Sequence, residues 1–187
     1  MRPEPTAATV WLERLERLPV RAAPWLERLP FRAALWLQPL AAIAHNLEEY
    51  PRILAYGARH YPFGIPPAEQ MTPAIILADI APIVVTALAW RSPPRSWRLQ
   101  VGLGYQAALC ANALGHLAQT LYFRDYSPGT LTGLLLVLPV GAYLYGRARR
   151  EGELSDRQLL VAAVLGTVVM PPGILLLQAA GAALASN

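Results

Sequence analysis

The chain has 187 residues, of which 55% are hydrophobic and 15% are charged, and its mean hydropathy is +0.32. Soluble domains carry about 25% charged residues, so this composition excludes an ordinary soluble enzyme and a disordered chain. The single cysteine, Cys110, excludes a disulfide framework and a cysteine-based zinc cluster.

The net charge of +4 comes from arginine alone, because all 16 basic residues are Arg and none is Lys. This usage is typical of a GC-rich genome and indicates a bacterial protein. The arginines flank apolar segments instead of forming one basic patch. The charge pattern therefore favours a membrane protein and predicts no nucleic-acid partner.

Residues 1–32 form a separate, arginine-rich region in which a sequence repeat begins at Leu15 and returns at Leu26. The offset of 11 residues corresponds to about three helical turns, so equivalent side chains share a face. Prolines interrupt any long helix here. We expect short amphipathic pieces on the membrane surface; a tail without function is the alternative.

Residues 33–187 contain five apolar runs, each near the ~20 residues that cross a bilayer. The expected spans are 33–57, 73–90, 97–123, 128–146 and 157–184. The sequence thus predicts an all-α, polytopic membrane protein with about five transmembrane helices behind an amphipathic N-terminal segment.

Arginine counts predict the orientation of these spans. Segment 1–32 has six Arg, the 91–98 loop three and the 147–157 loop four, whereas the alternate connections have far fewer. By the positive-inside rule we expect a multi-pass inner-membrane protein with a cytoplasmic N-terminus and an external C-terminus.

Ionisable and amide side chains inside the predicted spans are the candidate functional residues, because such groups are costly in hydrocarbon. His45, Glu48 and Glu49 share a face of the first span, and Asn112 and His116 share a face of the third. Asp79 lies in the second. In the predicted topology Glu49, Asp79 and His116 all lie about 9–12 Å below the outer surface, which predicts one cluster.

Imidazole and carboxylate groups in one cluster suit zinc, iron or manganese. We expect His45, Glu48 and His116 to be the metal ligands. Glu49 or Asp79 is then the general base or a further ligand, and Asn112 orients water or substrate.

A structural interpretation stays open for each of these residues. Glu48 and Glu49 have the spacing to pair with Arg52 on the same helix. Asp79 could be a protonated carboxyl group bonded to His116, and Asn112 could link helices.

The pattern His45-Asn-Leu-Glu48-Glu49 followed by Asn112-x-x-x-His116 resembles the HXXEE family of bacterial membrane proteins. Ser127-Pro128-Gly129 and Thr132 also fit, and the resemblance covers about 40–150. It implies a multi-span helical protein of uncharacterised activity, with a candidate active site at His45, Glu48, Glu49, Asn112 and His116.

We expect a membrane-embedded metal-dependent enzyme, a hydrolase acting on a lipid or other apolar small molecule. A transporter or ion carrier could use the same residues as binding or relay groups. A structural membrane protein is the third alternative. The sequence identifies neither the metal, the substrate, the reaction nor the oligomeric state.

Overall fold

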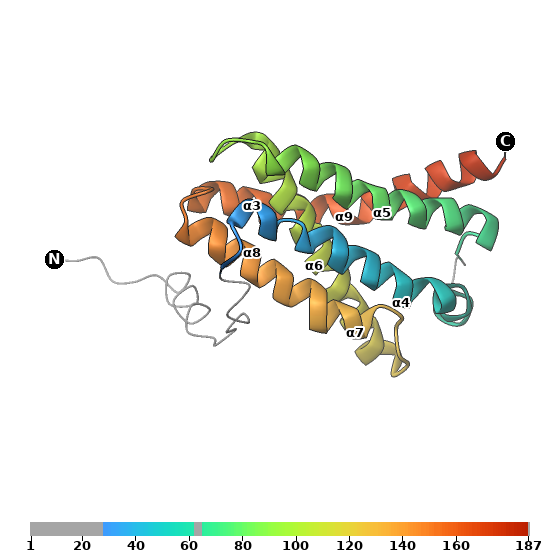
Figure 1. The fold of residues 1–187 in the computed structure, drawn as a ribbon. Helices are drawn as coiled ribbons and strands as arrows, with labels where there is room; N and C mark the ends of the chain where they lie inside the picture. Colours follow the sequence, from blue (N-terminus) through green and yellow to red (C-terminus); the bar gives the residue numbers. More distant parts are fainter. Residues whose placement is uncertain (1–27, 62–64, 187) are drawn as a thin grey trace.

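The computed structural model describes residues 28–61 and 65–186, and in these residues the chain is a helical bundle without strands (Figure 1). Its helices are α3 (Phe31–Ala34), α4 (Leu37–His60), α5 (Ala68–Trp90), α6 (Trp97–Phe123), α7 (Thr130–Thr132), the π-helical η1 (Gly133–Val137), α8 (Leu138–Arg150) and α9 (Asp156–Ala185). Since α7, η1 and α8 run on without a break, the described residues form five long helices. The predicted all-α bundle is confirmed.

The helices extend beyond some of the predicted apolar runs. The second run was expected to begin at residue 73, whereas α5 begins at Ala68. Its first residues are Ala, Glu, Gln and Met, which are strong helix formers although they are not all apolar. Residues 1–27 lie outside the described residues, and so does most of the expected amphipathic segment 1–32.

Within residues 28–61 and 65–186, three helices are long and apolar enough to cross a membrane: Ala68–Trp90, Thr130–Arg150 and Asp156–Ala185. Large apolar side chains on them are exposed, with Val168 at 65% and Leu176 at 71%. Such surfaces are stable against lipid but not against water, so these helices indicate a membrane protein. Helices α4 and α6 have spanning length but carry the polar candidate residues, which lowers their hydropathy; their crossing stays a prediction.

Close helix packing in the bundle depends on small residues. A Cβ atom at Gly166 of α9 would collide with the carbonyl oxygen of Gly104 in α6, so only glycine allows this approach. Small residues at helix contacts are typical of membrane bundles, where close backbone approach replaces the hydrophobic driving force. Figure 1 shows the long helices side by side, with α4 between α5 and α8.

The start of the described chain is attached to the α8–α9 end of the bundle. Arg147 of α8 donates to the carbonyl of Leu29 at 2.7 Å, and Arg32 pairs with Glu153 at 2.6 Å. These contacts hold α3 at one end of the bundle. The candidate site lies towards the other end, where α6 leads into α7.

Candidate metal centre

Helices α4 and α6 bring two buried histidines together. His45 and His116 are 1% and 5% exposed, and their ring centroids lie 5.1 Å apart at an interplanar angle of 62°. The helices are joined only through α5 and its loops, yet the two rings form one site. This separation is well within the reach of a shared metal ion.

The Nδ1 atom of His45 is hydrogen-bonded to the hydroxyl group of Thr132 in helix α7. Thr132 Oγ1 lies 3.2 Å from His45 Nδ1 and donates to Glu48 Oε2 at 2.6 Å. Because the hydroxyl proton is used towards Glu48, Thr132 accepts the Nδ1–H of His45. The neutral His45 ring therefore has its lone pair on Nε2.

His116 is held in the same way by a different chain of groups. Ser127 Oγ lies 3.0 Å from His116 Nδ1 and donates to Gln119 Oε1, also at 3.0 Å. Ser127 thus accepts the Nδ1–H, and the lone pair of neutral His116 is again on Nε2. Tyr61 donates to the same Gln119 oxygen at 3.0 Å, which orients the amide.

The Nε2 atoms of the two imidazoles face a common point. The Nδ2 atom of Asn112 lies 3.1 Å from His45 Nε2 and 3.2 Å from His116 Nε2. Glu49 Oε2 lies 3.8 Å from both nitrogens. Both Nε2 lone pairs therefore accept from the single Asn112 amide, and the Glu49 carboxylate oxygen lies beside them. Three acceptor atoms converge in this way, and a cation is the other group that could hold them together.

This donor set fits a metal ion. The ligand atoms of His45, Glu49 and His116 lie within 4.8 Å of one another. Ligand atoms ~2.0–2.2 Å from a tetrahedral metal are roughly 3.3–3.6 Å apart, so small side-chain movements would close the site. In metal sites the second ring nitrogen of a ligating histidine usually donates a hydrogen bond to a nearby acceptor. The Nδ1 atoms of His45 and His116 have such acceptors in Thr132 and Ser127.

The two neighbouring glutamates lie in the reverse of the expected arrangement. Glu48 was expected to be the ligand, but its carboxylate faces the loop before α7. It accepts from Gly129 N–H at 3.0 Å, from Thr132 N–H at 2.7 Å, from the Thr132 hydroxyl and from the Tyr126 hydroxyl. Glu48 therefore caps the start of α7, and Glu49 takes the place beside the imidazoles.

Asp79 does not join the group formed by His45, Glu49, Asn112 and His116. Its Oδ1 accepts from Asn46 Nδ2 at 2.7 Å, on a different face of α4 from His45. Successive residues of a helix point about 100° apart, so Asn46 turns towards α5 when His45 faces α6. The structure places Asp79 beside Asn46, the residue that follows His45, and not in the cluster that was expected.

Gly129 closes the site between the loop and the imidazoles. Its φ of 93° lies in the left-handed region, which favours glycine. A Cβ at this position would approach His45 Cε1 to 2.6 Å and His116 Cδ2 to 3.3 Å. Both the backbone conformation and the contact with the rings require a residue without a side chain.

The loop that carries Gly129 is also attached to the end of α4. Asp125 accepts from His60 Nε2 at 2.7 Å and from Arg59 Nη2 at 3.0 Å. These hydrogen bonds, first from His60 and then from Arg59, lower the pKa of the Asp125 carboxyl below its usual value. His60, the third histidine of the chain, therefore binds the loop through Asp125 and lies outside the candidate metal centre.

Sequence reasoning missed the roles of Gln119 and Tyr61 and did not assign those of Ser127 and Thr132. Gln119 lies three residues after His116, a spacing that places both on one side of α6. This spacing could have identified Gln119 from the sequence. The hydrogen bond between Thr132 and His45 could not be predicted in this way, because the two residues are 87 positions apart.

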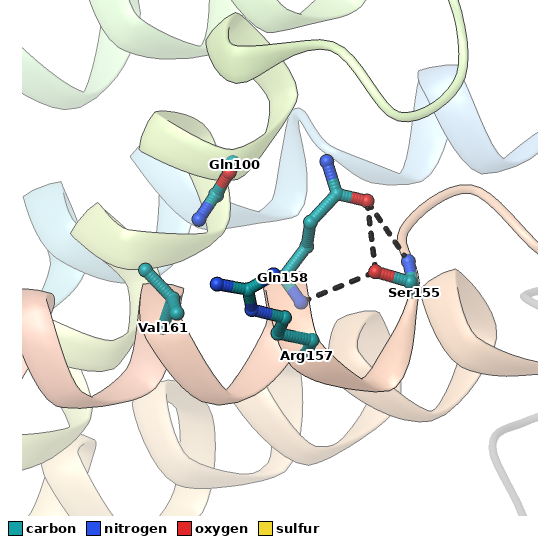
Figure 2. A pocket seen from close by; sticks show the side chains of 5 residues that line it. All are labelled: Gln100, Ser155, Arg157, Gln158 and Val161. Atoms are coloured by element: carbon teal, nitrogen blue, oxygen red, sulfur yellow. Dashed lines mark hydrogen bonds between the residues drawn. The ribbon is translucent and has the colours of Figure 1, made fainter.

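A shallow pocket lies near the beginnings of α6 and α9, lined by Gln100, Ser155, Arg157, Gln158 and Val161 (Figure 2). Ser155 and Gln158 cap α9 through reciprocal hydrogen bonds. The pocket contains neither histidine nor carboxylate, so it does not compete with the His45–His116 centre as a metal site.

Comparison with known proteins finds a family of unknown function over the region that contains this site. The family described as "Protein of unknown function with HXXEE motif" matches residues 36–144, which include all the residues of the centre. The chain is similar to the "Uncharacterized protein YrkK" of Bacillus subtilis (strain 168), with 28% identity over 98 residues. The match covers 48% of this chain and 62% of the relative, so the chain spans less than two thirds of that protein. No solved structure matches significantly.

Proposed function

The chain belongs to the HXXEE family, whose function is unknown, and we propose that it is a membrane-embedded, metal-dependent hydrolase. One observation carries the proposal. In the part of the chain that the structure describes, the Nε2 lone pairs of two buried histidines and a carboxylate oxygen of Glu49 face one point. The Asn112 amide is the proton donor that lies among them.

The donor set suggests which metals are suitable. Two imidazole nitrogens and a carboxylate favour zinc, iron or manganese over calcium or magnesium, which prefer oxygen ligands alone. Three protein ligands leave one coordination position for water or substrate. The Asn112 side chain lies beside both Nε2 atoms, and rotation of its amide would present either its oxygen or its N–H groups to a water or substrate bound there.

The residues of the centre can divide the work of a hydrolysis. A bound metal would supply a Lewis acid that makes water more acidic. Glu49 has a second carboxylate oxygen that can take a proton from the attacking water. In hydrolysis of an ester the water oxygen bonds to the acyl carbon, the acyl C–O bond breaks, and the proton passes to the leaving alkoxide.

The surroundings of the centre favour an apolar substrate. The helices around it expose apolar side chains, such as Leu131 at 55%. We place the protein in the bacterial inner membrane with a cytoplasmic N-terminus, from the arginine distribution. This orientation puts the centre in the outer half of the bilayer, where it can be reached by lipid.

Metal analysis of the purified full chain tests the metal centre. After growth and purification with added zinc, iron or manganese, the wild type should hold one metal ion per chain. His45→Ala and His116→Ala should lose it. His60→Ala is the matched control, because His60 contacts Asp125 outside the centre, and it should keep the metal. Full metal retention in His45→Ala and His116→Ala would refute the assignment.

The hydrolase step needs a separate measurement. Metal-loaded protein in phospholipid vesicles should release fatty acid or another lipid fragment, detected by mass spectrometry, and Glu49→Gln should abolish the release. Ion flux into sealed vesicles without any lipid product would favour the carrier alternative. A wild type that binds no metal and has neither activity would favour a structural protein.

A further inference from the structure

Arg52 is an exposed cation on the same face of α4 as the proposed metal ligands. His45, Glu49 and Arg52 follow one another at spacings of four and three residues, which aligns them along one side of the helix. Arg52 lies about 4.5 Å further along the helix axis than Glu49 and about 10 Å further than His45. Exposure rises along this side, from the buried His45 through the half-buried Glu49 to the exposed Arg52.

Neither acidic neighbour neutralises this arginine. The spacing of Glu48 and Glu49 allowed ion pairs with Arg52, but Glu48 accepts four hydrogen bonds from the loop and Glu49 faces the imidazoles. Among residues 28–61 and 65–186 no carboxylate forms an ion pair with Arg52, which is exposed. A charge held at this depth without a partner is available to an anion.

The surface beside Arg52 is suited to a lipid. Tyr126 lies near enough for its phenol to interact electrostatically with Arg52. The Tyr126 hydroxyl also accepts the N–H of Leu131 at 3.2 Å, so the exposed Leu131 side chain lies next to it. A cation, an aromatic ring and an exposed apolar residue thus lie in one neighbourhood, and these are the kinds of group that a phospholipid contacts.

We propose that Arg52 binds the phosphate group of an anionic phospholipid whose scissile bond reaches the His45–Glu49–His116 centre. This inference rests on the proposed function. A guanidinium group matches phosphate oxygens with two parallel N–H donors, which explains why arginine suits this position. The metal and Arg52 then define two anchoring points for one substrate.

Calorimetric titration of the zinc-loaded full chain in detergent tests the assignment. The probes are dihexanoyl phosphatidylglycerol, dihexanoyl phosphatidylcholine and inorganic phosphate. We expect the wild type to bind the phosphatidylglycerol most tightly. Arg52→Gln should weaken that binding about 10-fold, as loss of a charge-assisted hydrogen bond requires. Arg52→Lys should recover part of it.

Arg124→Asn is the matched control, because Arg124 is an exposed arginine at the same end of the bundle and its left-handed backbone tolerates asparagine. It should change binding less than 2-fold. Equal losses in both variants, equal affinity for the two lipids, or equal affinity for inorganic phosphate would each overturn the proposal. Metal content, measured on the same samples, should stay at one ion per chain in Arg52→Gln, so a failure of the metal centre is recognised separately.

Discussion

The group of polar side chains between α4, α6 and α7 and the contact between α6 and α9 lie in one bundle, yet they are built from different interactions. Around the metal centre, His45, His116 and Glu48 are each held by named hydrogen bonds. Between α6 and α9 the contacts are close backbone approaches through small residues such as Gly166. On the proposed function, the first region carries the chemistry and the second holds the helices together in lipid.

If this division is correct, the largest effect of a single substitution on metal binding, apart from the histidines, belongs to Glu49. Glu49→Gln removes the carboxylate that lies 3.8 Å from both imidazole nitrogens. We expect metal affinity to fall more than about 100-fold, because replacing a residue that only hydrogen-bonds to a metal ligand already lowers affinity by about 10–100-fold. Competition with a chelator measures the affinity. The thermal midpoint of the metal-free protein should hardly change, and wild-type affinity in this variant would contradict the assignment.

The opposite pattern is expected in the second region. Gly166→Leu forces a side chain against the backbone of α6, where even a Cβ collides with Gly104. Overpacking of this kind costs about 1–3 kcal/mol, so we expect a clear loss of thermal stability in detergent. Gly173→Leu is the control, because a Cβ there meets nothing within 4 Å. The folded fraction of Gly166→Leu should bind metal as the wild type does; a large loss of affinity would show that the two regions are coupled.

The groups that orient the histidines should have an intermediate effect. Thr132→Val removes the hydroxyl group that accepts from His45 and donates to Glu48. We expect about 10-fold weaker metal binding, as for other changes behind a metal ligand. Thr132→Ser should restore it, which a purely steric role of the methyl group would not predict. The visible spectrum of the cobalt-substituted protein reports the ligand geometry directly.

Replacement of Asp125 should have the smallest effect, a change in thermal stability whose size depends on pH. Its pKa is lowered in the folded chain by His60 and Arg59, so its contribution to stability is present above the unfolded pKa, which is near 3.8. The contribution is lost as the pH falls through the still lower folded pKa. Asp125→Asn should therefore lower the thermal midpoint slightly at pH 6 and by less at a pH well below 3.8. An equal difference at both pH values would show that the charge is not responsible.

Much of the centre was predictable from helical spacing, but the choice between the two glutamates was not. Glu48 and Glu49 lie three and four residues after His45, so they point about 60° to one side and 40° to the other of its direction. Either can share a face with the histidine. The position of α7 determines which glutamate faces the imidazoles, because the backbone N–H groups of Gly129 and Thr132 at its start bind the Glu48 carboxylate.

The same limit applies to Asp79. Its depth in the second helix follows from its distance to the end of the apolar run, and depth alone predicted that it would meet Glu49 and His116. Rotation about the helix axis is set by packing against other helices, and α5 turns Asp79 towards Asn46. A shared depth is therefore a weaker indication of contact than a shared helical face.

The sequence by itself determined the class of this protein: an all-α bundle of long apolar helices with histidine, glutamate and asparagine inside two of them. These features are local, since apolar runs and helical spacing need only the chain's own periodicity. Only the tertiary structure decided that Thr132 and Ser127 fix the tautomers of the two histidines, and that Glu49 faces their Nε2 atoms. Such contacts depend on the rotation and register of helices far apart along the chain, which no local pattern encodes.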